Sequence, residues 1–134
     1  MSYAKPVSLL LLASILGGCA TSGVSLGGAG VAPLPAGAAA LRTSLVADKN
    51  VKLSTRAEQS ALGAEYQALQ FGTVGQAVPW EADGYQGQVV PTQLYRVGSQ
   101  ECRGFIHTIT GKRDTTRRVA TACRSGEDLW TPVA

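Results

Sequence analysis

The chain has 134 residues, one histidine, three cysteines and a formal net charge of +3. This length is enough for one folded domain and not for two. The small net charge identifies no class of partner. A metal site needs three or four ligands, and one histidine with two cysteines that we expect to be oxidised cannot supply them, so we expect no metal site and no cofactor apart from covalent lipid.

The first nineteen residues have the layout of a bacterial export signal. Lys5 gives a positive start, residues 7–16 form an apolar run, and two glycines precede Cys19. A ten-residue helix reaches only about 15 Å, half the hydrocarbon core of a bilayer, so the run is too short to span a membrane. The segment Leu16-Gly17-Gly18-Cys19 resembles a lipobox. The resemblance implies cleavage before Cys19, a diacylglyceryl thioether on its sulfur, and acylation of the new N-terminus.

A lipidated terminus with two or more chains anchors a protein firmly in a membrane. In lipoproteins of this kind, an aspartate after the acylated cysteine favours retention in the inner membrane, whereas this chain has Ala20. We therefore expect an outer-membrane location, on the periplasmic or the surface side. The alternative is an ordinary secretory signal with an incidental cysteine.

The residues after the signal predict a spacer. Residues 20–40 consist mainly of small residues with Pro33 and Pro35 and carry no charge, which is typical of a flexible linker. A weakly helical stretch over residues 36–41 is an alternative. We divide the chain into a cleaved signal peptide (1–18), a lipidated flexible tether (19–50) and a folded domain (51–134).

The folded domain is predicted to begin with one helix. Thr55 and Glu58 have the spacing of a capping box, and Gly72 suits a left-handed C-terminal cap. Between them, a thin apolar stripe recurs at helical spacing, which requires close packing against a flat surface. Its members are Ala57, Ala61, Leu62, Tyr66 and Leu69.

The remainder predicts strands over residues 76–80, 87–97, 100–110, 115–124 and 129–133. Pro91 removes a ladder donor and therefore marks an edge or a bulge. The expected fold class is α+β, with one N-terminal helix packed on a small, mainly antiparallel sheet.

With Cys19 assigned to lipid, Cys102 and Cys123 remain to form a disulfide in an oxidising compartment. A hairpin loop of residues 111–114 places the two cysteines directly opposite each other, whereas a two-residue loop places them diagonally. Both registers put them on one face, because side chains alternate along a strand. Ile106 and Val119 share that face, which we expect to be the core side.

Seven basic and two acidic residues lie between residues 96 and 124. This excess favours an anionic envelope polymer, lipid headgroups or an envelope protein as partner. The alternative is a solvated face that discourages edge-to-edge pairing. Trp80 and Trp130 either belong to an exposed aromatic patch or fill the space between helix and sheet. Nucleic acid is not expected outside the cytoplasm. The candidate partner-binding residues are Arg103, Arg117, Arg118, Arg124 and Trp80.

The candidates for catalysis are weak. Residues 23–27 match G-x-S-x-G, but they lie in the tether with no strand before them. His107 has no nucleophile nearby in the sequence, and turn formation accounts for Glu81 and Asp83. We expect no enzymatic activity.

Residues 55–134 contain a series of short motifs: Ala61-Leu62, residues 75–80 and 87–95, Cys102-Arg103, Gly111, and residues 121–124 with Trp130. In this order they resemble the surface-antigen domain of the rickettsial 17-kilodalton outer-membrane lipoprotein family. The resemblance implies an envelope lipoprotein without catalytic residues, so we expect a structural or interaction module. The alternatives are a lipid-anchored inhibitor of an exported lysozyme or protease, and an accessory subunit of an envelope assembly.

Overall fold

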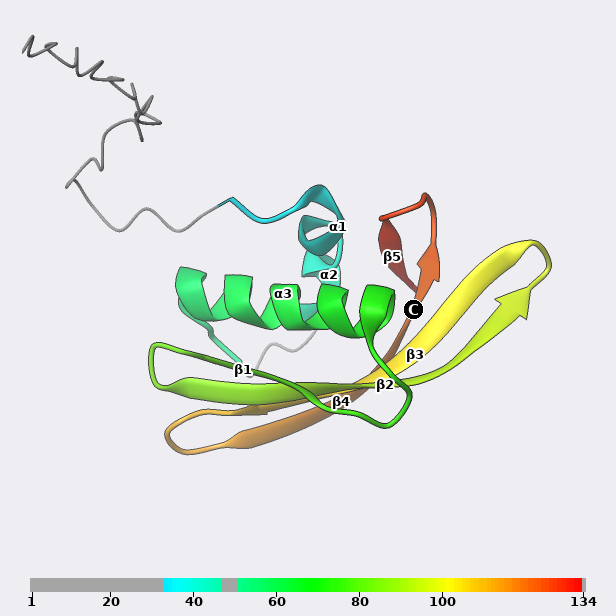
Figure 1. The fold of residues 1–134 in the computed structure, drawn as a ribbon. Helices are drawn as coiled ribbons and strands as arrows, with labels where there is room; N and C mark the ends of the chain where they lie inside the picture. The colour runs from blue at the N-terminus through cyan, green and yellow to red at the C-terminus, as the bar shows by residue number, and fades with distance from the viewer. Residues whose placement is uncertain (1–32, 47–50, 134) are drawn as a thin grey trace, which may run out of the picture. The chain divides into compact units, whose positions relative to one another are not determined.

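The structure is a computed structural model that describes residues 33–46 and 51–133 (Figure 1). The predicted signal peptide and Cys19 lie outside the described residues. In the described part of the chain the helices come first, and a five-stranded antiparallel sheet follows them. The α+β class is therefore confirmed. The elements are α1 (Ala36–Ala39), α2 (Arg42–Val46), α3 (Thr55–Phe71), β1 (Val78–Ala82), β2 (Tyr85–Val97), β3 (Gln100–Thr110), β4 (Thr115–Arg124) and β5 (Trp130–Val133).

Each strand of the sheet pairs with its neighbour in sequence, in the order β1-β2-β3-β4-β5. The predicted bounds of β3 and β4 are confirmed. Cys102 pairs with Cys123, which selects the register with the four-residue loop. On β2, the register shifts between Pro91 and Leu94, so the predicted irregularity at the proline is a bulge within an interior strand.

A two-residue loop, Asp83-Gly84, joins β1 to β2. Both residues have positive φ, 51° and 79°, the combination that matches the twist of antiparallel strands in a tight hairpin. Asparagine, aspartate and glycine tolerate this region best, so the sequence is well suited to this turn.

Both ends of α3 differ from the expected caps. The N-cap is Ser54, whose Oγ accepts the N–H of Ala57 at 3.2 Å, so the expected cap at Thr55 is one residue too late. The C-cap Gly72 has a φ of −69°, outside the left-handed region. Glycine is needed there for space, because a Cβ would press against the main chain of Ala68 and lie 2.9 Å from Pro91 Cγ.

Residues 36–46 correct the predicted boundary of the tether. They form α1 and α2, which pack against α3 (Figure 1). Leu41 is fully buried and Leu45 nearly so in the same core as α3. The aliphatic side chains, unlike the surrounding alanine and glycine, supply enough apolar area to order this segment. The described fold therefore begins well before residue 50.

The sheet face under α3 is the one opposite to the face we expected. On β3 the buried side chains toward the helix are Phe105, Ile109 and the polar His107. The disulfide lies on the other face, where Val119 is 67% exposed. The prediction from apolar content is wrong, because polar side chains on the helix side find partners inside the fold. Trp80 and Trp130 are buried in the core, so they fill the space between helix and sheet and do not form an exposed aromatic patch.

Candidate functional site

Four polar side chains from four elements form a continuous hydrogen-bonded chain inside the fold. The Nδ1 atom of His107 lies 2.8 Å from Oε1 of Glu65, and Trp80 Nε1 donates to His107 Nε2 at 2.9 Å. Ser44 Oγ donates to the second carboxylate oxygen of Glu65. Glu65 and His107 are 0% and 2% exposed, so water does not satisfy these groups and the partners within the fold do.

The contacts of His107 fix its tautomer. An indole N–H only donates, so Nε2 of His107 accepts from Trp80 and carries no proton. The proton therefore sits on Nδ1 and is donated to Glu65. Both ring nitrogens are occupied within the fold.

This geometry differs from that of an activated nucleophile. In such sites the hydroxyl contacts the imidazole, and the carboxylate orients the imidazole from its other side. Here the hydroxyl of Ser44 contacts the carboxylate, and an indole occupies the remaining nitrogen of His107. What the arrangement does is tie α2, α3, β1 and β3 together.

Arg103 of β3 is buried against the end of α3. Its Nη1 donates to the carbonyls of Ala68 and Leu69 at 3.2 and 3.0 Å, and its Nη2 donates to Gly72 at 2.6 Å. Its Nε donates to Thr92 at the β2 bulge at 3.0 Å. Burial lowers the pKa of this guanidinium, because desolvation penalises the charged form. Arg103, expected to contact a partner, instead fastens the helix to the sheet.

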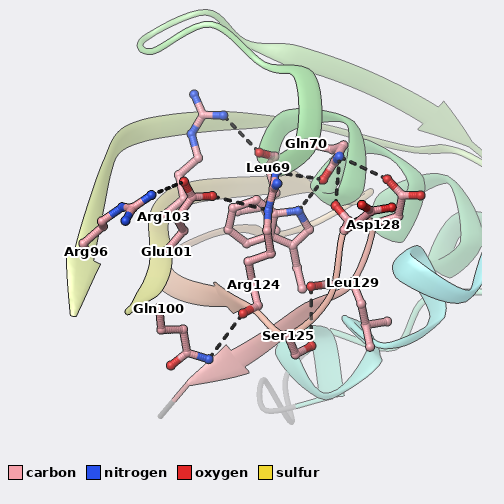
Figure 2. Close-up of polar contacts among 12 residues, drawn as sticks. Leu69, Gln70, Arg96, Gln100, Glu101, Arg103, Arg124, Ser125, Asp128 and Leu129 are labelled. Carbon is pink, nitrogen blue, oxygen red and sulfur yellow. Dashed lines mark hydrogen bonds and ion pairs between the residues drawn. The ribbon is translucent and has the colours of Figure 1, made fainter. Parts of the chain in front are cut away.

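A second cluster joins the end of α3 to β4 and β5 (Figure 2). Arg124 lies over the ring of Trp130, 5.0 Å from its centroid, and pairs with Glu101 at 3.6 Å. Trp130 Nε1 donates to Gln70 Oε1 at 2.7 Å. Arg124 is thus engaged within the fold, and the indole of Trp80, bound to His107, is as well.

The remaining candidates, Arg117 and Arg118, lie on β4. Arg117 is exposed and Arg118 half-buried, and neither takes part in an ion pair within residues 33–46 and 51–133. Near them, at the β3–β4 hairpin, is a cleft of about 470 Å³ with three cations on its rim. Its lining includes Lys52, Tyr85, Ile109, Lys112, Arg113 and Thr116.

The predicted disulfide is present between Cys102 and Cys123. Cys19, the predicted lipidation site, lies outside the described residues. In the described part of the chain, no three side chains of the metal-binding types gather into one group, and no helix there is long and apolar enough to cross a bilayer.

Sequence reasoning missed Glu65 as a member of the buried network. Its position gives a signal, because it lies four residues after Ala61 and four before Leu69, within the apolar stripe of α3. A carboxylate at such a position requires a buried partner, and His107 is the single histidine that could provide one.

Comparison with known proteins adds no identity: no protein-family model matches the chain, and no curated protein or solved structure matches it either.

Proposed function

We propose that this chain is a non-enzymatic outer-membrane lipoprotein whose folded part is a structural and interaction module of the cell envelope. The observation that carries the proposal is Cys19, directly after a basic start, a ten-residue apolar run and two glycines. Ala20 favours the outer membrane, and the resemblance of residues 55–134 to the surface-antigen domain points to the same location.

Two structural features support the proposal. The Cys102–Cys123 disulfide is of a kind that persists in oxidising compartments and is rare in the cytosol. The single histidine has both ring nitrogens engaged, with Trp80 and Glu65, which leaves it without a free site for acid–base chemistry. Arg117 and Arg118 of β4, which take part in no ion pair within the described residues, suit an interaction role.

Mass spectrometry of the protein from a Gram-negative host tests the proposal. We expect loss of residues 1–18 and the added mass of a diacylglyceryl group and an acyl chain on Cys19. The Cys19→Ser variant should remain unprocessed. As a matched control for location, Ala20→Asp should keep the lipid but shift the protein toward the inner membrane. An unmodified Cys19 thiol in the mature protein would overturn the proposal.

A further inference from the structure

Within the described residues, one part of β4 has a neighbouring strand on one side only, the side of β3. β5 pairs only with Thr121–Arg124, whereas β4 starts at Thr115 (Figure 1). Residues 115–120 therefore form an open edge of the sheet, which we name the β4 edge. Open edges present unpaired backbone donors and acceptors to any extended chain.

Two observations identify which backbone groups face outward from the β4 edge. The Cα atoms of Cys102 and Cys123 are 4.0 Å apart, a separation typical of a non-hydrogen-bonded pair. At the hairpin, the N–H of Gly111 donates to the carbonyl of Asp114, so these two residues are a hydrogen-bonded pair. Hydrogen-bonded and non-hydrogen-bonded pairs alternate along an antiparallel ladder, and both observations give the same alternation. The residues of β4 that direct both N–H and C=O away from β3 are therefore Thr115, Arg117 and Val119.

The side chains of the β4 edge disfavour pairing with a second copy of the same edge and favour an acidic strand. Arg117 and Val119 are exposed on the face away from α3, and Arg118 lies on the helix side. Two copies of this edge paired with each other would bring arginines close together, which is destabilising. An acidic strand would place carboxylates beside the same arginines on both faces.

The cleft at the β3–β4 hairpin also favours an acidic partner. Thr116, the second residue of the edge, lines it together with Lys52, Lys112 and Arg113. A side chain opposite Thr116 in an added strand would lie on the same face as the cleft. Because the lining has three cations and a single acid, Asp114, it favours a carboxylate opposite Thr116, in addition to those opposite Arg117 and Arg118.

We propose that the β4 edge binds an extended acidic segment of an envelope protein by strand addition. An antiparallel strand in line with β5 would present an apolar residue opposite Val119, followed by acidic residues opposite Arg118, Arg117 and Thr116. Lipid headgroups and polysaccharides match the charge but not the alternating donors and acceptors of a strand edge. This inference rests on the proposed interaction role and names the partner chemistry for it.

A peptide of sequence Thr-Val-Glu-Glu-Glu-Thr-Val tests the inference with the full-length lipoprotein in nonionic detergent. Its valine and following three glutamates match the order above. The control peptide carries N-methyl groups on the residues opposite Val119 and Arg117, which removes two backbone donors and keeps the charge. Fluorescence anisotropy should show at least about tenfold weaker binding of the control.

Amide hydrogen exchange gives a second readout that charge alone would not move. The peptide should slow exchange at Thr115, Arg117 and Val119 at least about tenfold. The amides of Arg118 and Ala120, which already bond to β3, should change little.

Two pairs of protein variants locate the site. Val119→Pro removes one outward donor and should abolish binding, whereas Val119→Thr keeps the donor and should bind. Arg117→Gln with Arg118→Gln should weaken binding about tenfold. The double variant Arg42→Gln with Arg56→Gln changes the net charge equally and should bind as the parent does.

Equal binding of both peptides would overturn strand addition, since charge alone would then account for it. Binding of anionic phosphatidylglycerol vesicles through Arg117 and Arg118, with no peptide binding, would overturn it in favour of a lipid surface. Neither result touches the proposed function, which depends on the lipid at Cys19.

Discussion

Arg103 on β3 lies with its Nη2 2.6 Å from the carbonyl oxygen of Gly72, the residue that caps α3. The last turn of α3 contains no basic residue of its own. Helix C-termini carry unsatisfied carbonyls and partial negative charge, and the guanidinium of a distant strand supplies both the donors and the cation. The contact therefore sets the position of α3 on the sheet.

Replacing Arg103 should destabilise the fold more than replacing any exposed arginine. Arg103→Met leaves several carbonyls without donors, for which we expect a loss of about 2–4 kcal/mol in the free energy of unfolding. Arg103→Lys should recover part of this loss, because an ammonium cannot reproduce the planar fork. Urea unfolding of the detergent-solubilised lipoprotein measures both. Arg96→Met, on a side chain that is 70% exposed, should change stability by less than about 0.5 kcal/mol. Equal effects at the two positions would contradict the capping role.

Gly63 within α3 and Gly72 at its C-cap should respond to alanine in opposite directions. At Gly63, in the middle of the helix, a Cβ meets nothing within 4 Å, so Gly63→Ala should stabilise the fold by about 0.5–1 kcal/mol. At Gly72 a Cβ would press on Ala68 and Pro91, so Gly72→Ala should destabilise it by about 1–3 kcal/mol. Thermal unfolding of the two variants side by side gives the signs. Stabilisation by Gly72→Ala would contradict the packing described at this cap.

The indole of Trp80 should matter for its N–H as well as for its bulk. Trp80→Phe leaves Nε2 of His107 buried without a donor, and we expect a loss of about 1–3 kcal/mol, part of it from lost volume. As a control, Tyr85→Phe removes an exposed hydroxyl that donates to the Lys52 carbonyl and should cost less than about 0.5 kcal/mol. Nitrogen-15 NMR should find the proton of His107 on Nδ1 in the parent protein. A proton on Nε2 would contradict the network.

Loss of the disulfide should weaken the fold without changing its register. The cysteines are 21 residues apart in sequence, and closing a loop of this length stabilises by about 3 kcal/mol on the chain-entropy model. The double variant Cys102→Ala, Cys123→Ala should lose about that amount in urea unfolding. A reducing agent should have the same effect on the parent and none on the variant. A parent protein indifferent to reduction would show that the bond contributes little.

The β3–β4 hairpin could be predicted closely from sequence because local rules determine it. A Gly-Lys-Arg-Asp segment between two alternating runs predicts the strand ends and leaves two registers open, and the structure has the one that pairs Thr110 with Thr115. The missing N–H of Pro91 likewise predicts an edge or a bulge, and the structure has a bulge between Pro91 and Leu94. These features depend on residues close together in the chain.

The buried face and the buried network could not be predicted, because they depend on distant partners. Arg103 and His107 look like surface residues until the carbonyls of α3 and the carboxylate of Glu65 are placed beside them. Val119 looks like a core residue, yet α3 lies on the other face. The same holds for Leu41, whose burial depends on α3 packing alongside a segment with the composition of a linker.

The order of the sheet has a consequence for how the chain acquires its structure. Since every strand pairs with the one before or after it, each pairing in the sheet closes only a short loop, and one hairpin can form without the others. Cys102 and Cys123 meet when a single one of these closures is complete. We therefore expect oxidation to need neither a docked helix nor a finished sheet, but only the closed β3–β4 hairpin.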